Sequence, residues 1–253
     1  MYGSARLIVA LIVALASIAE AGDEYRVIQV TGAGKLIGTV RMAGDVPEPR
    51  TLTVTRDKAV CGQEQTAQDL FVNPENMGLK NVVVSIPQIA AGKSFVGDSE
   101  LVISQIGCVY EPHVQVYRPQ SRLTIRNNDD VLHNIHAFAG EEVLFNVAQP
   151  SYVKRWPIRL LETDSVIRVQ CDVHEWMDAY LVPATNPYFA VTDNDGAFEL
   201  DQLPAGTHTL QVWHETLGIS TREVTVTADV SAVVNFELSI PASKPVEEPE
   251  GSN

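Results

Sequence analysis

The chain has 253 residues and a formal net charge of −14, from 32 acidic and 18 basic side chains. An acidic surface repels phosphate groups, so this balance argues against nucleic acid and anionic lipid as partners and favours a basic patch on a partner protein. The length is sufficient for two small domains.

Residues 1–22 have the pattern of a cleaved export signal. Arg6 precedes an apolar run from Leu7 to Ile18, and small residues such as Ala21 follow it. The run is shorter than the roughly 20 residues of a comfortable membrane span, although an uncleaved segment that tethers the protein to a membrane stays open. The sequence therefore predicts a periplasmic or secreted protein.

The rest of the chain is predicted to be all-β. Short runs rich in Val, Ile, Leu and Thr recur between turn signals, and helical periodicity is almost absent. Residues 241–253 are rich in Pro, Glu and Ser without an apolar run, which predicts a disordered tail. The predicted strands are residues 35–42, 79–86, 100–106, 114–117, 123–127, 166–170, 208–213, 223–227 and 233–238.

A candidate metal site lies in residues 171–177, where Cys171, His174 and Met177 follow a C-x-x-H-x-x-M spacing. A short loop between two strands can bring these side chains to one ion, and His133, after a turn that ends a predicted strand, can supply the fourth ligand. Two imidazoles, one thiolate and one thioether form the ligand set of an electron-transfer copper site. Structural zinc usually collects more Cys or His and does not need Met177.

Three cysteines are an odd number, which matters in an oxidising compartment. If Cys171 binds copper, Cys61 and Cys108 are left as a pair and are predicted to form a disulfide. The alternative is that these two are separate buried thiols.

Neighbours of the ligands have competing interpretations. His136 should point to the opposite face of its strand from His133, which favours a supporting role over a ligand role. Trp176 can cover the site, or it can form a docking surface together with an exposed edge of His174. The acidic residues of the loop, Asp172, Glu175 and Asp178, are either idle or steer a basic redox partner.

Residues 99–183 resemble a cupredoxin of the plastocyanin and amicyanin kind. The segments that carry the resemblance are 123–129, 133–136 and the ligand loop 171–177. The resemblance implies a Greek-key β-sandwich that binds one type 1 copper ion through His133, Cys171 and His174, with Met177 as the axial ligand. Asn134 matches a family residue that helps to hold the two ligand segments together.

Residues 192–200 and 203–210 resemble part of a carboxypeptidase regulatory-like domain, a small transthyretin-like β-sandwich without catalytic residues of its own. The first two strands of that domain resemble residues 34–40 and 81–86, far upstream. The resemblance implies a discontinuous domain, residues 25–95 and 184–240, with the cupredoxin inserted. The alternative is that the N-terminal strands extend the cupredoxin sheet.

These observations predict an exported one-electron carrier that acts between redox partner proteins and has no small-molecule substrate. We expect no enzyme, because a Cys–His nucleophile needs a base and oxyanion donors that are not evident, and six His residues are too few for a multicopper oxidase. The alternative function is a non-redox copper-binding or structural cell-envelope module that retains the cupredoxin fold.

Overall fold

A computed structural model describes residues 25–96, 100–159 and 165–241 of the chain. The predicted signal peptide and residues 242–253 of the predicted tail lie outside these ranges. Strands make up nearly all the regular structure, which confirms the all-β fold class. The described ranges contain one helix, α1 (Lys58–Cys61). None of their helices is long and apolar enough to cross a membrane.

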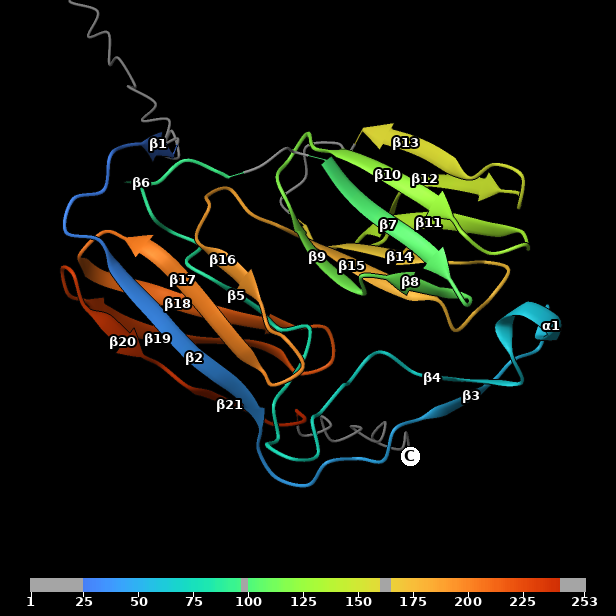
Figure 1. The fold of residues 1–253 in the computed structure, drawn as a ribbon, viewed down its shortest axis with the longest axis horizontal. Coiled ribbons are helices and arrows are strands. Elements are labelled where there is room, and N and C mark those ends of the chain that lie inside the picture. Colours follow the sequence, from blue (N-terminus) through green and yellow to red (C-terminus); the bar gives the residue numbers. More distant parts are fainter. Residues whose placement is uncertain (1–24, 97–99, 160–164, 242–253) are drawn as a thin grey trace, which may run out of the picture.

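The strands form two β-sandwiches that lie side by side (Figure 1). We call them the central sandwich, built from residues 100–183, and the outer sandwich, built from strands on both sides of that segment.

The central sandwich packs a four-stranded sheet against a five-stranded sheet around one apolar core. Its core side chains, such as Ile103, Leu123 and Ile135, are fully buried. Each contributes about 1.5–3 kcal/mol by leaving water. The first sheet has the order β13 (Arg155–Arg159), β10 (Arg122–Asn127), β7 (Glu100–Ile106) and β8 (Val109–Glu111). The second has the order β12 (Glu142–Gln149), β11 (His133–Ala139), β14 (Ile167–Gln170), β15 (Asp178–Pro183) and β9 (Val114–Tyr117).

The outer sandwich combines strands that precede and follow the central one in sequence. In one sheet the order is β16 (Phe189–Val191), β5 (Val83–Ser85), β18 (Gly206–His214) and β19 (Gly218–Val226). In the other it is β17 (Ala197–Leu203), β2 (Gly34–Met42) and β20 (Ser231–Val233), with β21 (Phe236–Leu238) also paired to β2. Both β2 and β5 pair with strands that come after residue 183, and neither pairs with a strand of the central sandwich.

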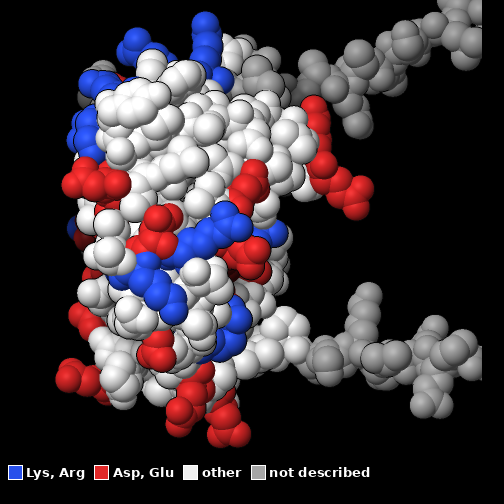
Figure 2. Space-filling model, turned by 90° about the vertical axis from the view of Figure 1, so that its right-hand side faces the viewer, with Lys and Arg blue, Asp and Glu red and all other residues white. Residues whose placement is uncertain are grey.

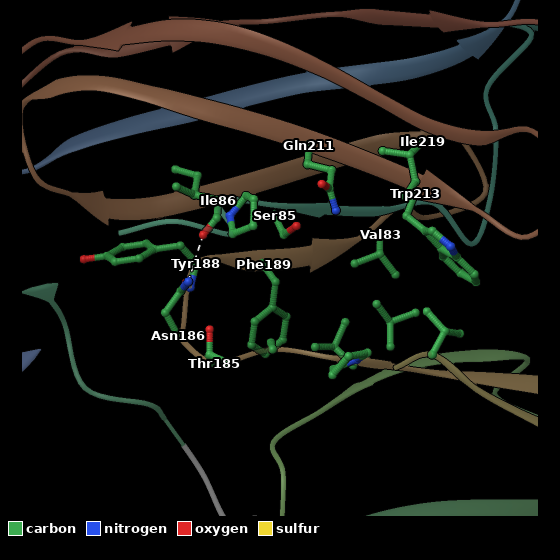
Figure 3. Close-up of a pocket in the computed structure, with 16 residues that line it drawn as sticks. Val83, Ser85, Ile86, Thr185, Asn186, Tyr188, Phe189, Gln211, Trp213 and Ile219 are labelled. Atoms are coloured by element: carbon green, nitrogen blue, oxygen red, sulfur yellow. Dashed lines mark hydrogen bonds between the residues drawn. The ribbon is translucent and has the colours of Figure 1, made fainter. Parts of the chain in front are cut away.

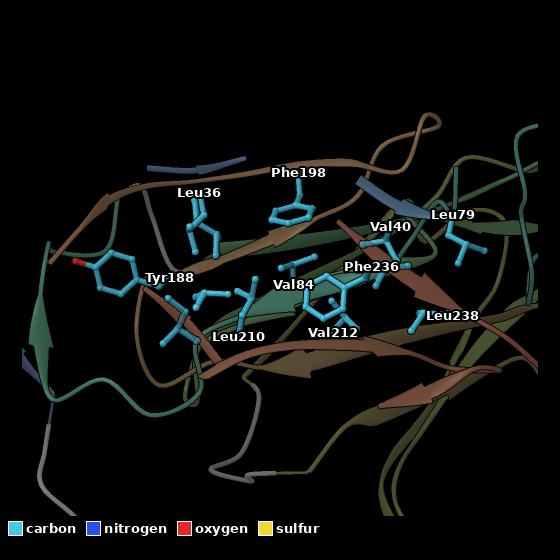
Figure 4. Packing of buried hydrophobic residues seen from close by; sticks show 14 of the residues in the cluster. Leu36, Val40, Leu79, Val84, Tyr188, Phe198, Leu210, Val212, Phe236 and Leu238 are labelled. Atoms are coloured by element: carbon cyan, nitrogen blue, oxygen red, sulfur yellow. The ribbon is translucent and has the colours of Figure 1, made fainter. Parts of the chain in front are cut away.

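The core of the outer sandwich is separate from the central core. Leu36, Val84, Phe198 and Leu210 reach into it from β2, β5, β17 and β18 (Figure 4). The alternation of buried and exposed positions along these strands explains the period-2 pattern of the sequence. Each sandwich therefore has a hydrophobic core of its own.

The two sandwiches meet through a smaller apolar cluster. Val83 of β5 packs there with Val114 and Val182 of the central sandwich, and Trp213 lies against the same cluster. A cavity of about 330 Å³ opens beside it, and Val83, Phe189 and Trp213 line one side (Figure 3). The contact between the sandwiches is therefore incompletely packed.

Residues 51–66 leave the outer sandwich and run to the far end of the central one, where α1 lies near the ends of β7 and β8 (Figure 1). Strands β3 (Thr51–Thr53) and β4 (Glu64–Thr66) pair with each other, and α1 lies between them in sequence. We call residues 51–66 the cap. A short parallel pair, β1 (Arg26–Val27) and β6 (Ala91–Gly92), completes the strands.

Candidate metal centre

One end of the central sandwich gathers the predicted ligands. His133 begins β11, Cys171 directly follows β14, and Met177 directly precedes β15. The ligand loop is a tight turn, because the Cys171 N–H donates to the Met177 carbonyl at 3.1 Å and the Met177 N–H donates to the His174 carbonyl at 3.0 Å. The sheet thus holds the ends of the loop 171–177 together.

Three of the four predicted ligands present their donor atoms to one another. The Nδ1 atoms of His133 and His174 lie 2.9 Å apart, and Cys171 Sγ lies 3.8 Å from His174 Nδ1. All three side chains are buried, and their donor atoms fall within 4.8 Å of one another. Met177 is buried in the same core cluster as Cys171. The sequence prediction therefore selected residues that the fold brings together.

Two carboxylates fix the orientation of the histidine rings. His133 Nε2 lies 2.9 Å from Asp129 Oδ2, and His174 Nε2 lies 2.9 Å from Asp57 Oδ2. An ionised carboxylate only accepts hydrogen bonds, so these contacts favour a proton on each Nε2, and a neutral ring then keeps a lone pair on Nδ1. Two lone pairs that face each other at 2.9 Å repel unless a cation or a proton lies between them. This donor set fits a metal ion.

Burial favours the uncharged forms of two of the predicted ligands, Cys171 and His133. Burial raises the pKa of the Cys171 thiol, although hydrogen bonds that include one to Asn134 oppose the change. Burial also lowers the pKa of His133, and His174 lowers it further, although Asp129 opposes both effects. A metal ion at this point would therefore have to displace the proton of Cys171.

Asn134 links the two ligand segments, as the cupredoxin resemblance implies. Its Oδ1 accepts from the Asp172 N–H at 2.7 Å and from Cys171 Sγ at 3.3 Å. Its Nδ2 donates to Asp172 Oδ2 at 2.9 Å and to Asn146 Oδ1 at 2.9 Å. The side chain thus ties β11 to the start of the ligand loop.

The other predicted neighbours lie around the ligands rather than among them. His136 Nδ1 contacts Asp172 at 2.9 Å, outside the group of three donors. Trp176 packs against the His174 ring and donates from Nε1 to the Cys108 carbonyl at 3.0 Å. Of the acidic loop residues, Asp172 is held by Asn134 and His136, Asp178 is partly buried and Glu175 is exposed.

Cys61 and Cys108 form a disulfide, which confirms their predicted pairing, and Cys171 is a free thiol. The disulfide joins the cap to the turn between β7 and β8. Cys61 and Cys108 also lie near His174, and Cys108 lies near Asp129 and His133. A disulfide offers no thiolate, so these two groups do not make further metal sites while it is intact.

The expected exposed edge of His174 is absent, and this part of the prediction is wrong. The His174 side chain has no exposed surface, because the cap brings Asp57 and Cys61 to its Nε2 edge. Sequence reasoning also missed Asp57 and Asp129. The predicted disulfide was the available signal for Asp57, because it implies that residues near Cys61 lie beside those near Cys108.

The face that carries α1 shows no large patch of one charge sign. Acidic and basic side chains mix across its middle, and a broad uncharged area lies above them (Figure 2). The excess of acidic residues is therefore not concentrated on this face.

Comparisons with known proteins support part of this description. Residues 181–239 match the carboxypeptidase regulatory-like domain. The match includes β16 to β21 but not β2 and β5, which pair with them. A comparison with curated proteins finds no match.

Among solved structures, the chain is similar to a reduced Cu(I) form of an amicyanin mutant, with 21% identity, 35% of this chain and 85% of that chain covered, and a TM-score of 0.30. It is also similar to a purple cupredoxin from Nitrosopumilus maritimus, with 22% identity, 34% and 100% coverage, and a TM-score of 0.30. A copper-containing nitrite reductase from Thermus scotoductus SA-01 has 14% identity, 38% and 24% coverage, and a TM-score of 0.30.

Proposed function

We propose that the protein is a mononuclear type 1 copper protein that carries single electrons between redox partners. The observation that carries the proposal is the convergence of His133 Nδ1, His174 Nδ1 and Cys171 Sγ at one buried point. Neutral imidazoles and a thiolate hold both oxidation states of copper, whereas a magnesium or calcium site needs oxygen ligands. His133, Cys171 and His174 would hold the copper, with Met177 as a weaker fourth ligand, and the metal would supply a one-electron change at this point.

The surrounding residues supply rigidity. Asn134 fixes the start of the ligand loop, the two loop hydrogen bonds fix its shape, and Asp129 and Asp57 fix the rings. Ligands that do not rearrange let the charge of a metal change with little movement. A buried site also excludes water from the centre. These properties suit electron transfer better than catalysis on a small substrate.

We also propose an exported location and a protein redox partner. A disulfide persists in an oxidising compartment, which agrees with the export signal predicted for residues 1–22. The outer sandwich, as a regulatory-like domain split by the central sandwich, would display the metal end or dock it on the partner.

The test is to add Cu(II) to the purified protein and record the visible absorption of a thiolate-to-copper transition. We expect an intense band at one copper per chain that is absent in Cys171→Ser. His208→Gln is the matched control, because His208 lies in the outer sandwich, where Nε2 contacts the Pro204 carbonyl. A wild-type protein without the band, or a Cys171→Ser variant that keeps it, contradicts the proposal.

A second candidate is a copper-holding protein without a redox role. The specific observation that favours it is the complete burial of His133 and His174, which leaves neither imidazole edge at the surface. The two candidates differ in electron exchange with small reductants. A carrier is reduced and reoxidised rapidly and repeatedly, whereas a holding protein binds copper but exchanges electrons slowly.

A further inference from the structure

The cap places a carboxylate on a candidate metal ligand from a distant part of the chain. Asp57 and His174 are 117 residues apart in sequence, yet Oδ2 of the first lies 2.9 Å from Nε2 of the second. His174 has no exposed surface, whereas the Asp57 side chain is 39% exposed. The carboxylate therefore lies between the imidazole and the solvent.

The side chain of Asp57 does not cap the helix that follows it. It is the N-cap residue of α1, a position where Asp commonly accepts a hydrogen bond from the first turn, but its side chain makes no capping bond. Its backbone is in the left-handed region, with φ 52° and ψ 35°, which is uncommon for a residue other than Gly. A forgone capping bond together with an unfavourable backbone is typical of a residue held in place for function.

Two ties hold the cap in this position. The Cys61–Cys108 disulfide joins α1 to the turn between β7 and β8, and Cys61 Sγ lies 3.8 Å from His174 Nε2. Gln65 Nε2 donates to the Cys61 carbonyl at 2.7 Å and to the Gly107 carbonyl at 3.0 Å. The location of Asp57 is therefore set by cross-links to the central sandwich and not by the local chain alone.

Without Asp57 the His174 ring has a competing tautomer. A proton on Nδ1 would let His174 donate to His133 Nδ1, which lies 2.9 Å away. That hydrogen bond would occupy the space between the two nitrogens where a metal ion must bind. An acceptor at Nε2 favours the tautomer that keeps Nδ1 free.

We propose that Asp57 is a positioning residue for the metal centre: presented by the disulfide-latched cap, it holds His174 in the Nε2–H tautomer and keeps Nδ1 available to the metal. The inference deepens the proposed function and rests on it for the identity of the ion. It assigns the cap a role in preparing the site before any metal arrives. It also places the route of electrons to a partner away from the covered His174 edge.

The test is ¹⁵N nuclear magnetic resonance of the histidine rings in the metal-free full chain. In the wild type we expect His174 to be in the Nε2–H tautomer. Asp57→Ala should convert a substantial share of His174 to the Nδ1–H tautomer, whereas Asp57→Asn, which keeps an acceptor oxygen, should retain the wild-type form. Glu64→Gln is the control, because Glu64 is an exposed carboxylate in the same cap.

Zn(II) provides a second readout that does not depend on redox activity. We expect Asp57→Ala to weaken Zn(II) binding about 10- to 100-fold, the usual cost of losing a partner of a ligating histidine. The Cys61→Ser/Cys108→Ser variant should show the same change in tautomer. If it does not fold, Asp57→Ala still decides the question, because its disulfide is intact.

An unchanged His174 tautomer in Asp57→Ala overturns the inference, and so does unchanged Zn(II) affinity. Failure of the proposed function looks different. In that case the wild-type protein shows no thiolate-to-copper band, while the tautomer of His174 still responds to Asp57→Ala.

Discussion

At the scale of single residues, polar contacts around the ligands determine the shape of the candidate metal centre. Asp129 shows this most clearly, because its carboxylate accepts from the N–H groups of Gly107 and Cys108 at 2.7 and 2.9 Å and also contacts His133 Nε2. The same side chain thus orients a ligand and holds the turn that carries the disulfide. Disturbing one of these contacts should therefore affect both the site and the stability of the fold.

Asn134→Ala should destabilise the protein by about 2–3 kcal/mol, because it leaves buried donors and acceptors of the ligand loop without a partner. It should also increase the rate at which a thiol reagent modifies Cys171 in the metal-free protein, since Asn134 Oδ1 contacts Cys171 Sγ and the Asp172 N–H. Urea denaturation and the reaction rate check these expectations. Asn146→Ala is the matched control, because Asn146 is exposed and shares the contact to Asp172 without reaching Cys171. Equal effects of both variants would contradict the role of Asn134.

The residue scale also shows how far sequence could predict the site. The C-x-x-H-x-x-M spacing selected Cys171 and His174, which the structure brings together because both lie on one loop, where chain distance limits spatial distance. His133 was found because it starts a strand after a recognisable turn. Asp57 could not be found this way, since its contact depends on where the cap crosses the molecule. A carboxylate that reaches a ligand from 117 residues away leaves no local pattern.

At the scale of elements, predicted strands were most accurate where a run of β-branched residues was bounded by turns. Residues 100–106 and 114–117 form β7 and β9 with the predicted bounds. The predicted strand 79–86 is shortened to β5, because Leu79 makes only an isolated bridge to Val72. The cap was missed because β3 and β4 have three residues each and α1 has four. Elements this short carry too little periodicity to be recognised.

Two glycines of β2 let this strand approach neighbouring segments of the outer sandwich closely. A Cβ at Gly34 would lie 2.3 Å from Val226 Cγ1, and a Cβ at Gly38 would lie 1.8 Å from the Val234 carbonyl oxygen. Only glycine allows the chain to approach so closely without a backbone shift. The two glycines of β2 therefore reflect its close approach to Val226 in β19 and to Val234 between β20 and β21.

His214, the last residue of β18, should make the stability of the outer sandwich depend on pH. The pKa of His214 is lowered to about 4, chiefly by burial and also by nearby His113, while Asp69 opposes both effects. His214 Nδ1 also accepts from the backbone N–H groups of Thr216 and Leu217 at 3.2 and 3.4 Å, which requires an unprotonated nitrogen. The folded protein therefore favours the neutral form of His214.

Because the folded pKa of His214 lies below the unfolded value of about 6.5, its contribution to stability is present above pH 6.5 and is lost as the pH falls toward 4. We expect the loss to be about 2 kcal/mol at pH 5. The measurement is the free energy of unfolding in urea at pH 7.5 and pH 5 for the wild type and for His214→Gln. The difference between the two proteins should shrink at pH 5, and a difference independent of pH would show that His214 does not titrate in this way.

At the scale of the whole molecule, a buried ion pair joins the two sandwiches. His113, in the loop between β8 and β9, contacts Glu215, in the turn between β18 and β19, and both side chains are 4% exposed. Burial opposes the charged form of His113, but the hydrogen bond and charge of Glu215 outweigh burial and raise its pKa. The ring of Tyr180 packs against both His113 and Trp213. Polar and aromatic contacts therefore bridge the interface beside its cavity.

This pair should couple the unfolding of the sandwiches. The cavity of about 330 Å³ leaves the apolar contact between them incomplete, so we expect the ion pair to contribute to their association. Removing one partner leaves the other buried and unpaired, which costs about 3–5 kcal/mol, whereas removing both costs less than the sum. We expect one calorimetric unfolding transition in the wild type and two in His113→Gln. In His113→Gln/Glu215→Gln the midpoints of the two transitions should move back toward each other. The control is Lys35→Gln, because Lys35 pairs with Glu199 on the partly exposed surface of the outer sandwich alone. Two transitions in the wild type with midpoints insensitive to His113→Gln would mean that the sandwiches unfold independently and that the pair does not join them.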